Sequence, residues 1–354
     1  MVNLMEDSKK HELKLGPWKP ELFLDVSRPI RSRIKLFFRR NHPCQQIPNG
    51  LDKLDHPQLR VYHCPNFSMI TVGLRKSGDT MPSFDDDKIR ELESRCHIRP
   101  RENAIWYDAG GEKLVHYFAC ALTSIQAAEV IKEFRDLVEE FTPTAPAPSE
   151  KRSARFLEWR DHIGTAKKSG VIRLTFHHQR NHSHQKPPNP SSDFVSKSGK
   201  KTTAAAEFRK SRTMIDVADT ISIMFAAVDP YTWHRYRDVY VDMASKFRLV
   251  KECDPNGIQC FVGHYTLINM LTTPHWDTTD PPRGWVAMLV VGDFREGELC
   301  IPELDVAIPY QSGDVVFLRS WMLLHFIKRY RGPERYVVVY ATTYSIFEWL
   351  DAAF

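Results

Sequence analysis

From Cys260 to Phe354, short apolar runs alternate with clusters of turn-forming residues. The runs are rich in β-branched and aromatic residues, which favour strands, and Gly, Pro, Ser and Asp separate them. Because no helical periodicity lies between the runs, the pattern predicts an antiparallel sandwich or barrel. The predicted strands are Phe261–Met270, Trp285–Val291, Glu298–Ile301, Val315–Leu318, Leu323–Ile327 and Tyr336–Thr342.

Helical periodicity is found upstream of this β-rich region. Two helices are predicted at about 203–228 and 231–247, with an Asp-Pro pair between them. Further upstream, Thr123 and Gln126 have the spacing of a capping box, which satisfies the first free backbone N–H groups of a helix. The apolar residues that follow recur at spacings of three and four, so the sequence predicts a helix there as well.

Three regions are predicted along the chain. Apolar runs at 104–107 and 114–118 flank a Gly-rich turn and predict a hairpin within an accessory region of mixed α and β structure. A proline-rich stretch then predicts an extended linker. The expected boundaries are 1–141 for the accessory region, 142–204 for the linker with a basic, partly disordered segment, and 205–354 for the β-rich domain.

The positive charge of the chain is concentrated in one segment. The net charge of the whole chain is +5, whereas residues 151–213 contain 15 Lys and Arg against 4 Asp and Glu. A local positive field attracts polyanions, so nucleic acid, with DNA favoured, is the expected partner. The alternative is a solvated basic loop that binds nothing, since Pro187–Ser192 and Lys197–Lys201 have the composition of surface loops.

Composition excludes several classes of protein. Apolar residues make up 42% of 354 positions, enough to bury one large core or two smaller ones. The seven cysteines are scattered without CxxC spacing, so neither a zinc ribbon nor a disulfide framework is expected. The chain opens without a secretory apolar core and contains no apolar run of membrane-spanning length. We therefore expect an intracellular protein, nuclear rather than cytoplasmic, with no membrane association; the pattern indicates no oligomeric state.

Candidate chemistry lies at His275 and Asp277. On an extended segment, residues two apart point to the same side, so the imidazole and the carboxylate converge. With a second histidine they form the two-His-one-carboxylate set that binds iron(II) and leaves coordination positions open. His325, which follows the predicted strand Val315–Leu318, is the expected third ligand. The His-x-Asp pair alone is weak evidence, because roughly one such pair arises by chance at this composition.

An arginine near the C-terminus adds to this set. Arg335 follows His325 at the start of the last apolar strand, where a charged residue is otherwise unfavourable. The far carboxylate of 2-oxoglutarate requires a buried cation, and a guanidinium binds a carboxylate through two hydrogen bonds. Arg335 is the candidate for that role and Arg319 is the reserve. The alternative for Arg335 is an arginine at the sheet edge that is ion-paired at the surface.

The order of these residues resembles the double-stranded β-helix dioxygenases. The segments GELCIPEL and SGDVVFLRS lie between the His-x-Asp pair and His325, and the likeness, over about 205–354, is greatest to the TET/JBP group. That group oxidises the methyl group of thymine or 5-methylcytosine in nucleic acid. The resemblance implies an α+β fold with a jelly-roll core supported by helices. It also implies iron(II) held by His275, Asp277 and His325, with 2-oxoglutarate bound by Arg335 and O2 as the oxidant.

Residues for substrate recognition are harder to assign. Asp280 stands where family members read a flipped-out base, although it also suits a turn before two prolines. Tyr265 and Asn269 precede the His-x-Asp pair and are interpreted as core residues in preference to substrate contacts. Where base-reading members carry a histidine after the arginine, this chain has the segment 342–344, Thr-Thr-Tyr.

Two other functions fit the same residues. The chain is alternatively a dioxygenase acting on a small molecule or a protein side chain, or a catalytically silent β-helix in which His275 and His325 are core residues. A histidine cluster was left out of the candidate site, because irregular spacing and the lack of cysteine partners favour a solvated loop. Its members are His177, His178, His182 and His184.

Overall fold

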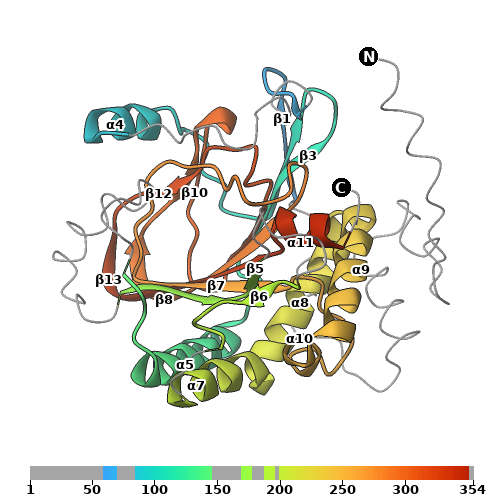
Figure 1. The fold of residues 1–354 in the computed structure, drawn as a ribbon. Coiled ribbons are helices and arrows are strands. Elements are labelled where there is room, and N and C mark those ends of the chain that lie inside the picture. Colours follow the sequence, from blue (N-terminus) through green and yellow to red (C-terminus); the bar gives the residue numbers. More distant parts are fainter. Residues whose placement is uncertain (1–58, 70–83, 146–168, 178–186, 196–198, 351–354) are drawn as a thin grey trace, which may run out of the picture.

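The computed structural model describes residues 59–69, 84–145, 169–177, 187–195 and 199–350. Its largest element is an eight-stranded sheet with the spatial order β1-β2-β3-β11-β8-β13-β7-β4 (Figure 1). Neighbouring strands run antiparallel except β1 and β2, which are parallel. In chain order the strands are β1 (Arg60–Cys64), β2 (Ala104–Asp108), β3 (Lys113–Phe118), β4 (Gly170–Leu174), β7 (Gly263–Ile268), β8 (Val286–Glu296), β11 (Val315–Leu318) and β13 (Tyr330–Ala341).

A smaller antiparallel sheet packs against the inner face of the large one. Its strand order is β10-β9-β12, and its side chains Leu299 and Ile327 share an apolar cluster with Met288 and Val337 of the large sheet. The predicted α+β class with two facing antiparallel sheets is confirmed. The elements are β9 (Leu299–Ile301), the 3-10 helix η4 (Pro302–Leu304), β10 (Val306–Ile308) and β12 (Phe326–Ile327), and a separate two-stranded sheet joins β5 (Phe176–His177) to β6 (Asn189–Pro190).

Helices cover the outer face of the large sheet (Figure 1). The predicted capping box is present, because the Thr123 hydroxyl and the Gln126 side chain satisfy each other's backbone N–H groups. The helix predicted over 203–228 is wrong as a single element: Ser211 breaks it by capping a new helix through Met214 N–H. The helices are α5 (Ser124–Glu140), α7 (Gly199–Lys210), α8 (Arg212–Val228), α9 (Pro230–Lys246), α10 (Arg248–Glu252) and α11 (Tyr344–Trp349), with α4 (Asp86–Ser94) beside the small sheet.

The large sheet crosses the boundary expected near residue 141. β2 and β3 form the predicted hairpin, and β3 then pairs with β11, so that Val315 lies opposite Phe118. β11 is flanked by β8 on its other side, and β3 therefore satisfies backbone groups that would otherwise lie at a sheet edge. Within the proline-rich stretch, Thr144 exchanges two backbone hydrogen bonds with Val171 of β4. The predicted accessory region and the β-rich domain thus share one sheet.

The last strand is longer than predicted. β13 begins at Tyr330, six residues before the predicted start at Tyr336, and it contains a bulge between Arg331 and Glu334. Gly332 permits this path, because a Cβ there would lie 2.3 Å from the backbone oxygen of Asp293. β13 pairs with β7 on one side and β8 on the other, which places it in the middle of the sheet. The short strand β10 was not predicted.

The basic segment 151–213 is described only in part. Its described portion contributes β4, β5, β6, α7 and the cap of α8, and none of the histidines at 178, 182 and 184 lies within the described residues. Within the described part of the chain, no helix combines the length and apolar character needed to cross a bilayer.

Asp219 on α8 makes the stability of this fold depend on pH. Burial raises the pKa of its carboxyl to about 7, although Asn256 donates a hydrogen bond to it. Because the folded-state pKa lies above the usual value, the folded state retains a proton that the unfolded state releases. The free energy of unfolding should therefore fall as pH rises from about 4 to about 7.

Asp219→Asn should reduce that fall by up to about 4 kcal/mol, measured by urea unfolding at several pH values. Glu129→Gln is the control, since Glu129 is an exposed carboxylate on α5 and has no part in the shift at Asp219. Equal pH dependence in wild type and Asp219→Asn would contradict this account.

Candidate metal and co-substrate site

The backbone brings the three candidate metal ligands together. His275 and His325 pair as an isolated antiparallel bridge, in which each N–H donates to the other residue's carbonyl at 3.1 Å. Asp277 N–H donates to Ser320 O, also at 3.1 Å, which holds the segment after His275 beside the segment before His325. Two segments far apart in sequence, 275–277 and 320–325, are thereby fixed against each other.

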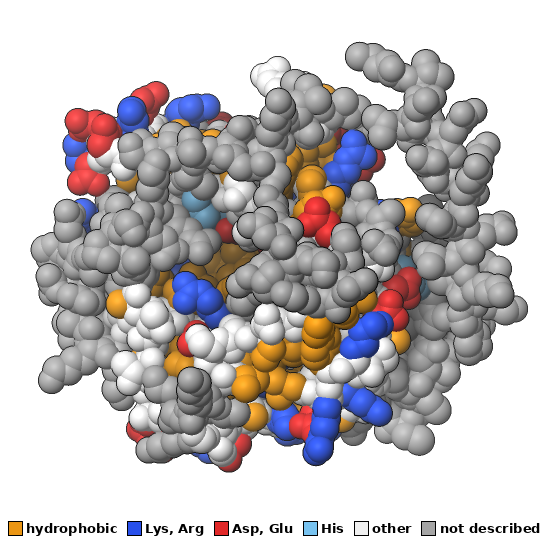
Figure 2. Space-filling model, viewed as in Figure 1, with side chains coloured by type: hydrophobic (Ala, Val, Ile, Leu, Met, Phe, Trp, Pro, Cys, Tyr) orange, Lys and Arg blue, Asp and Glu red, His pale blue; other side chains and the backbone are white. Residues whose placement is uncertain are grey.

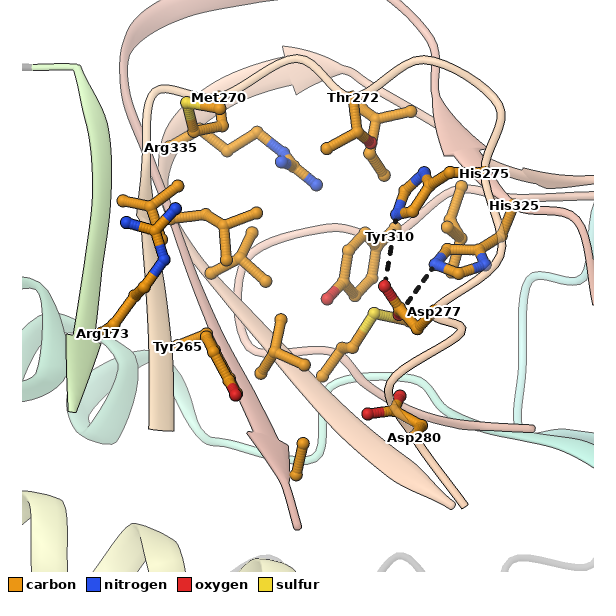
Figure 3. Close-up of a pocket in the computed structure, with 18 of the residues that line it drawn as sticks. Arg173, Tyr265, Met270, Thr272, His275, Asp277, Asp280, Tyr310, His325 and Arg335 are labelled. Carbon is orange, nitrogen blue, oxygen red and sulfur yellow. Dashed lines mark ion pairs between the residues drawn. The ribbon is translucent and has the colours of Figure 1, made fainter. Parts of the chain in front are cut away.

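The side-chain geometry of this set suits a metal ion. Nε2 of His275 lies 3.7 Å from Asp277 Oδ1, and Nε2 of His325 lies 3.5 Å from Asp277 Oδ2 (Figure 3). The ligand atoms of the three residues all lie within 4.8 Å of one another. Nδ1 of each imidazole lies close to a backbone oxygen, that of Thr273 at 2.7 Å and that of Leu323 at 3.0 Å. When Nδ1 carries the proton, each Nε2 presents its lone pair to the common centre.

The electrostatics of the set also favour a cation. Burial by itself lowers the pKa of His325, but the hydrogen bond and the charge of Asp277 outweigh it and leave that pKa raised. The carboxylate therefore stabilises positive charge at the point where the two imidazoles meet. A divalent ion bound by both Nε2 atoms and one carboxylate oxygen would satisfy the same field without a proton on either ring.

Arg335 lies in the same cavity and has no charged partner among the described residues. It is 2% exposed, and its Nε and Nη2 atoms have no hydrogen-bond acceptor in the described part of the chain. Its guanidinium carbon is 5.3 Å from the ring centroid of Tyr310 and 5.4 Å from that of Tyr330. Burial lowers the pKa of Arg335, so the charge is costly to keep there without an anion.

Neighbouring groups fix the position of Arg335. Asn269, which has a positive φ of 50°, accepts a hydrogen bond from Arg335 N–H at 2.7 Å and donates its own N–H to Arg335 O at 2.8 Å. The next residue, Tyr336, points to the opposite face of the sheet and stacks on Phe134 of α5 at 4.7 Å. Asn269 is thus a satisfied core residue that holds the strand, as expected.

The reserve candidate Arg319 has a structural role. It donates to the backbone oxygens of Lys113 and Arg283, pairs with Asp229 at 3.4 Å, and stacks over the Trp285 ring at 4.3 Å. It does not line the cavity. Arg319 and Arg335 are both buried arginines, but of these two it is Arg335 whose guanidinium has atoms without acceptors among the described residues.

One cavity of about 160 Å³ connects the three candidate metal ligands with Arg335. Since one water molecule needs roughly 10–15 Å³ by this measure, the space accommodates a small dicarboxylate. On the face shown in Figure 2, a histidine and an acidic side chain lie recessed next to a hydrophobic area. The lining residues are Val171, Arg173, Tyr265, Leu267, Met270, Thr272, His275, Asp277, Thr279, Asp280, Met288, Leu299, Tyr310, His325, Ile327, Arg335, Val337, Val339 and Ala341.

Asp280 and Tyr265 both line this cavity. Asp280 is 7% exposed, its N–H donates to Asp277 O in a turn, and its carboxylate accepts a hydrogen bond from the Ser320 hydroxyl at 2.6 Å. Both interpretations of Asp280 therefore describe its position: it closes a turn and it faces the cavity. Tyr265 faces the cavity as well (Figure 3), whereas the sequence favoured a core position.

Sequence reasoning missed several polar residues of the cavity, among them Tyr310 and Arg173. Tyr310, in the loop after β10, approaches Arg335, and its hydroxyl has no partner among the described residues. Arg173 on β4 was counted only as part of the basic segment. The signal for Arg173 was available, since an arginine within an apolar strand is the same feature that selected Arg335; no comparable pattern marks Tyr310.

Comparisons with known proteins show a likeness of fold. No protein-family model matches the chain, and a search of curated proteins finds no relative. A solved structure of NgTET1 in complex with 5mC DNA is 14% identical, covering 74% of this chain and 92% of that one, with a TM-score of 0.48. A structure of OsALKBH1 is 12% identical, covering 64% and 96%, with a TM-score of 0.30.

Metal binding tests the arrangement directly. His275→Ala and Asp277→Ala should each weaken iron(II) binding, measured by anaerobic calorimetry, by more than the roughly tenfold to hundredfold cost of losing an outer-shell partner. His97→Ala is the control, because His97 is exposed and pairs with Asp305 away from the cavity. Wild-type affinity in both site variants would rule out this metal site.

Proposed function

We propose that this protein is an iron(II)- and 2-oxoglutarate-dependent dioxygenase that hydroxylates a C–H bond, most directly the methyl group of a nucleobase in nucleic acid. The observation that carries the proposal is the meeting of four side chains in one cavity. His275, Asp277 and His325 offer one nitrogen, one oxygen and one nitrogen at one end, and the guanidinium of Arg335 lies in the same space. His275 and Asp277 lie about 50 positions before His325, and Arg335 follows on the next long strand, β13.

The donor set fits iron(II). Two imidazoles and one carboxylate leave further coordination positions open, and that combination is typical of iron(II) oxygenases and not of four-coordinate structural zinc. An iron(II) ion bound there, together with O2 and 2-oxoglutarate, supplies the oxidation of an unactivated C–H bond. The bridge between His275 and His325 holds both imidazoles in place before any metal arrives, which limits the reorganisation that binding requires.

The environment of Arg335 fits the far carboxylate of 2-oxoglutarate. A buried guanidinium without a protein acceptor requires an anion, and two parallel hydrogen bonds to a carboxylate supply both the charge and the acceptors. The ring of Tyr310 lies beside the guanidinium, and its hydroxyl, which has no partner among the described residues, is available to donate to a ligand in the cavity. The two ends of the cavity thus bind the two ends of one dicarboxylate.

The walls between these ends keep water away from the reacting centre. Leu267, Met288, Val337 and Val339 line the cavity between the metal ligands and the guanidinium. An apolar lining excludes bulk water and leaves the polar groups at the ends to orient what binds. Near the opening, Tyr344 N–H donates to Thr279 O at 2.8 Å, which fixes the segment after β13 to the turn that carries Asp277.

Two features support a nucleic-acid substrate. The basic segment 151–213 supplies the positive field that attracts a polyanion, and part of it, β4, forms a wall of the cavity. Asp280 beside the metal ligands offers an acceptor for a base that has been flipped out of its stack. A DNA substrate implies a nuclear location, which imaging of the tagged protein tests. A small molecule or a protein side chain is the competing substrate class.

Replacement of Arg335 tests the co-substrate role. Arg335→Met should weaken 2-oxoglutarate binding by about a hundredfold or more. In this variant the far carboxylate of 2-oxoglutarate would be buried without a partner, which costs about 3–5 kcal/mol. The measurement is calorimetric titration of 2-oxoglutarate into the Mn(II)-loaded protein without oxygen. Arg331→Gln, on the same strand but with a side chain 82% exposed, should bind as the wild type does. Equal affinity in Arg335→Met would exclude this role.

Product analysis tests the substrate class. Purified protein with iron(II), 2-oxoglutarate and O2 should convert methylated oligonucleotides to hydroxymethylated products, detected by nucleoside mass spectrometry. His275→Ala and Asp277→Ala should give no product. Succinate release stimulated by metabolites or peptides, and not by any methylated DNA or RNA, would overturn the nucleic-acid part and favour the competing class.

A further inference from the structure

A second guanidinium lines the cavity. Arg173 lies on β4, at the edge of the large sheet, and faces the same space as Arg335 (Figure 3). Its backbone is fully used, since its N–H donates to Asp193 at 2.9 Å and its carbonyl accepts from the Ser191 hydroxyl. Its guanidinium has no ion pair or hydrogen bond within the described part of the chain. Arg173 is therefore a cation directed into the cavity from its outer wall.

On the cavity side, the strand neighbours of Arg173 are two apolar residues and one phenol. Val171 precedes it on the same face of β4, and Tyr265 of β7 is its direct cross-strand neighbour, with Leu267 opposite Val171. All four line the cavity. Directly opposite residues in antiparallel strands have Cβ atoms about 4.5–5.5 Å apart, so Arg173 and Tyr265 are neighbours on the cavity face of the sheet, with the guanidinium and the phenol ring directed to opposite sides (Figure 3).

The charges of the cavity leave Arg173 without a counter-ion once the co-substrate is bound. Asp277 lies between the two imidazoles, and Asp280 accepts from Ser320. Of the two carboxylates of 2-oxoglutarate, one is directed to the metal end and the other to Arg335. An anionic group of a substrate that enters the cavity can therefore pair with the half-buried guanidinium of Arg173.

We propose that Arg173 binds a phosphate of the nucleic-acid strand next to the target nucleotide, with the ring of Tyr265 packed against the substrate beside it. The inference rests on the proposed function and names the anionic group that the substrate contributes. A guanidinium binds two phosphate oxygens at once, which fixes the register of the strand relative to the metal end. Arg173 thereby connects the basic segment to the cavity, because it belongs to both.

The experiment compares three variants with the wild type. Two of them remove one positive charge, and the third keeps the charge at position 173 but changes its shape. Fluorescence anisotropy of a labelled, methylated oligonucleotide at about 50–200 mM salt gives the number of phosphate contacts from the slope of log affinity against log salt. Arg173→Gln should lower that slope by about 1 and raise KM for the oligonucleotide about tenfold, with a much smaller effect on kcat. Arg173→Lys should restore the slope but not the full KM, since lysine keeps the charge and loses the two-pronged contact.

Arg331→Gln removes the same charge from an exposed position on β13 outside the cavity and should leave slope and KM unchanged. The methylated nucleoside, which lacks phosphate, should be turned over equally poorly by wild type and by Arg173→Gln. An unchanged slope and KM in Arg173→Gln, with a wild type that binds and modifies the oligonucleotide, would overturn the phosphate contact alone. A wild type that neither binds nor modifies nucleic acid would overturn the proposed function and this inference with it.

Discussion

Two backbone hydrogen bonds between His275 and His325 are the constraint on which the candidate site depends. They join loops that are 50 positions apart, and each histidine ring is oriented by the carbonyl two residues before it, Thr273 for one and Leu323 for the other. Because the bridge is antiparallel, the two side chains leave it on the same side, with ring centroids 4.3 Å apart. Asp277 completes the set through its own bond to the Ser320 backbone.

The rest of the cavity shows how buried charge distinguishes a structural role from a binding role. Arg319 and Arg335 are both almost fully buried, and desolvation makes either charge costly. The protein satisfies Arg319 with backbone oxygens, a carboxylate and an aromatic face. Around Arg335 it supplies aromatic rings but leaves two nitrogen atoms without acceptors in the described part of the chain. That difference, and not burial or charge alone, marks Arg335 as a residue that awaits an anion.

The outer layers of the fold hold these groups in place. Tyr336 stacks on Phe134 outside the sheet, and strand alternation then directs Arg335 into the cavity. β3 satisfies the free side of β11, which connects the helical layer and the early hairpin to the same sheet as the site. The region expected to be accessory is therefore part of the support for the site, and changes in its core would be felt at β11 and β8.

The sequence determined the antiparallel β class, the capping box, the hairpin and the His-x-Asp pair, because each depends on local periodicity or on residue type at short spacing. It offered His325 and Arg335 as partners of that pair, with Arg319 in reserve. It did not determine the bulge in β13, the break at Ser211, or the extension of the sheet across residue 141, since these depend on partners distant in the chain. Only the tertiary structure separated Arg335 from Arg319 and placed Arg173 in the cavity. Which acceptors surround a guanidinium is decided by packing, and no spacing in the sequence encodes it.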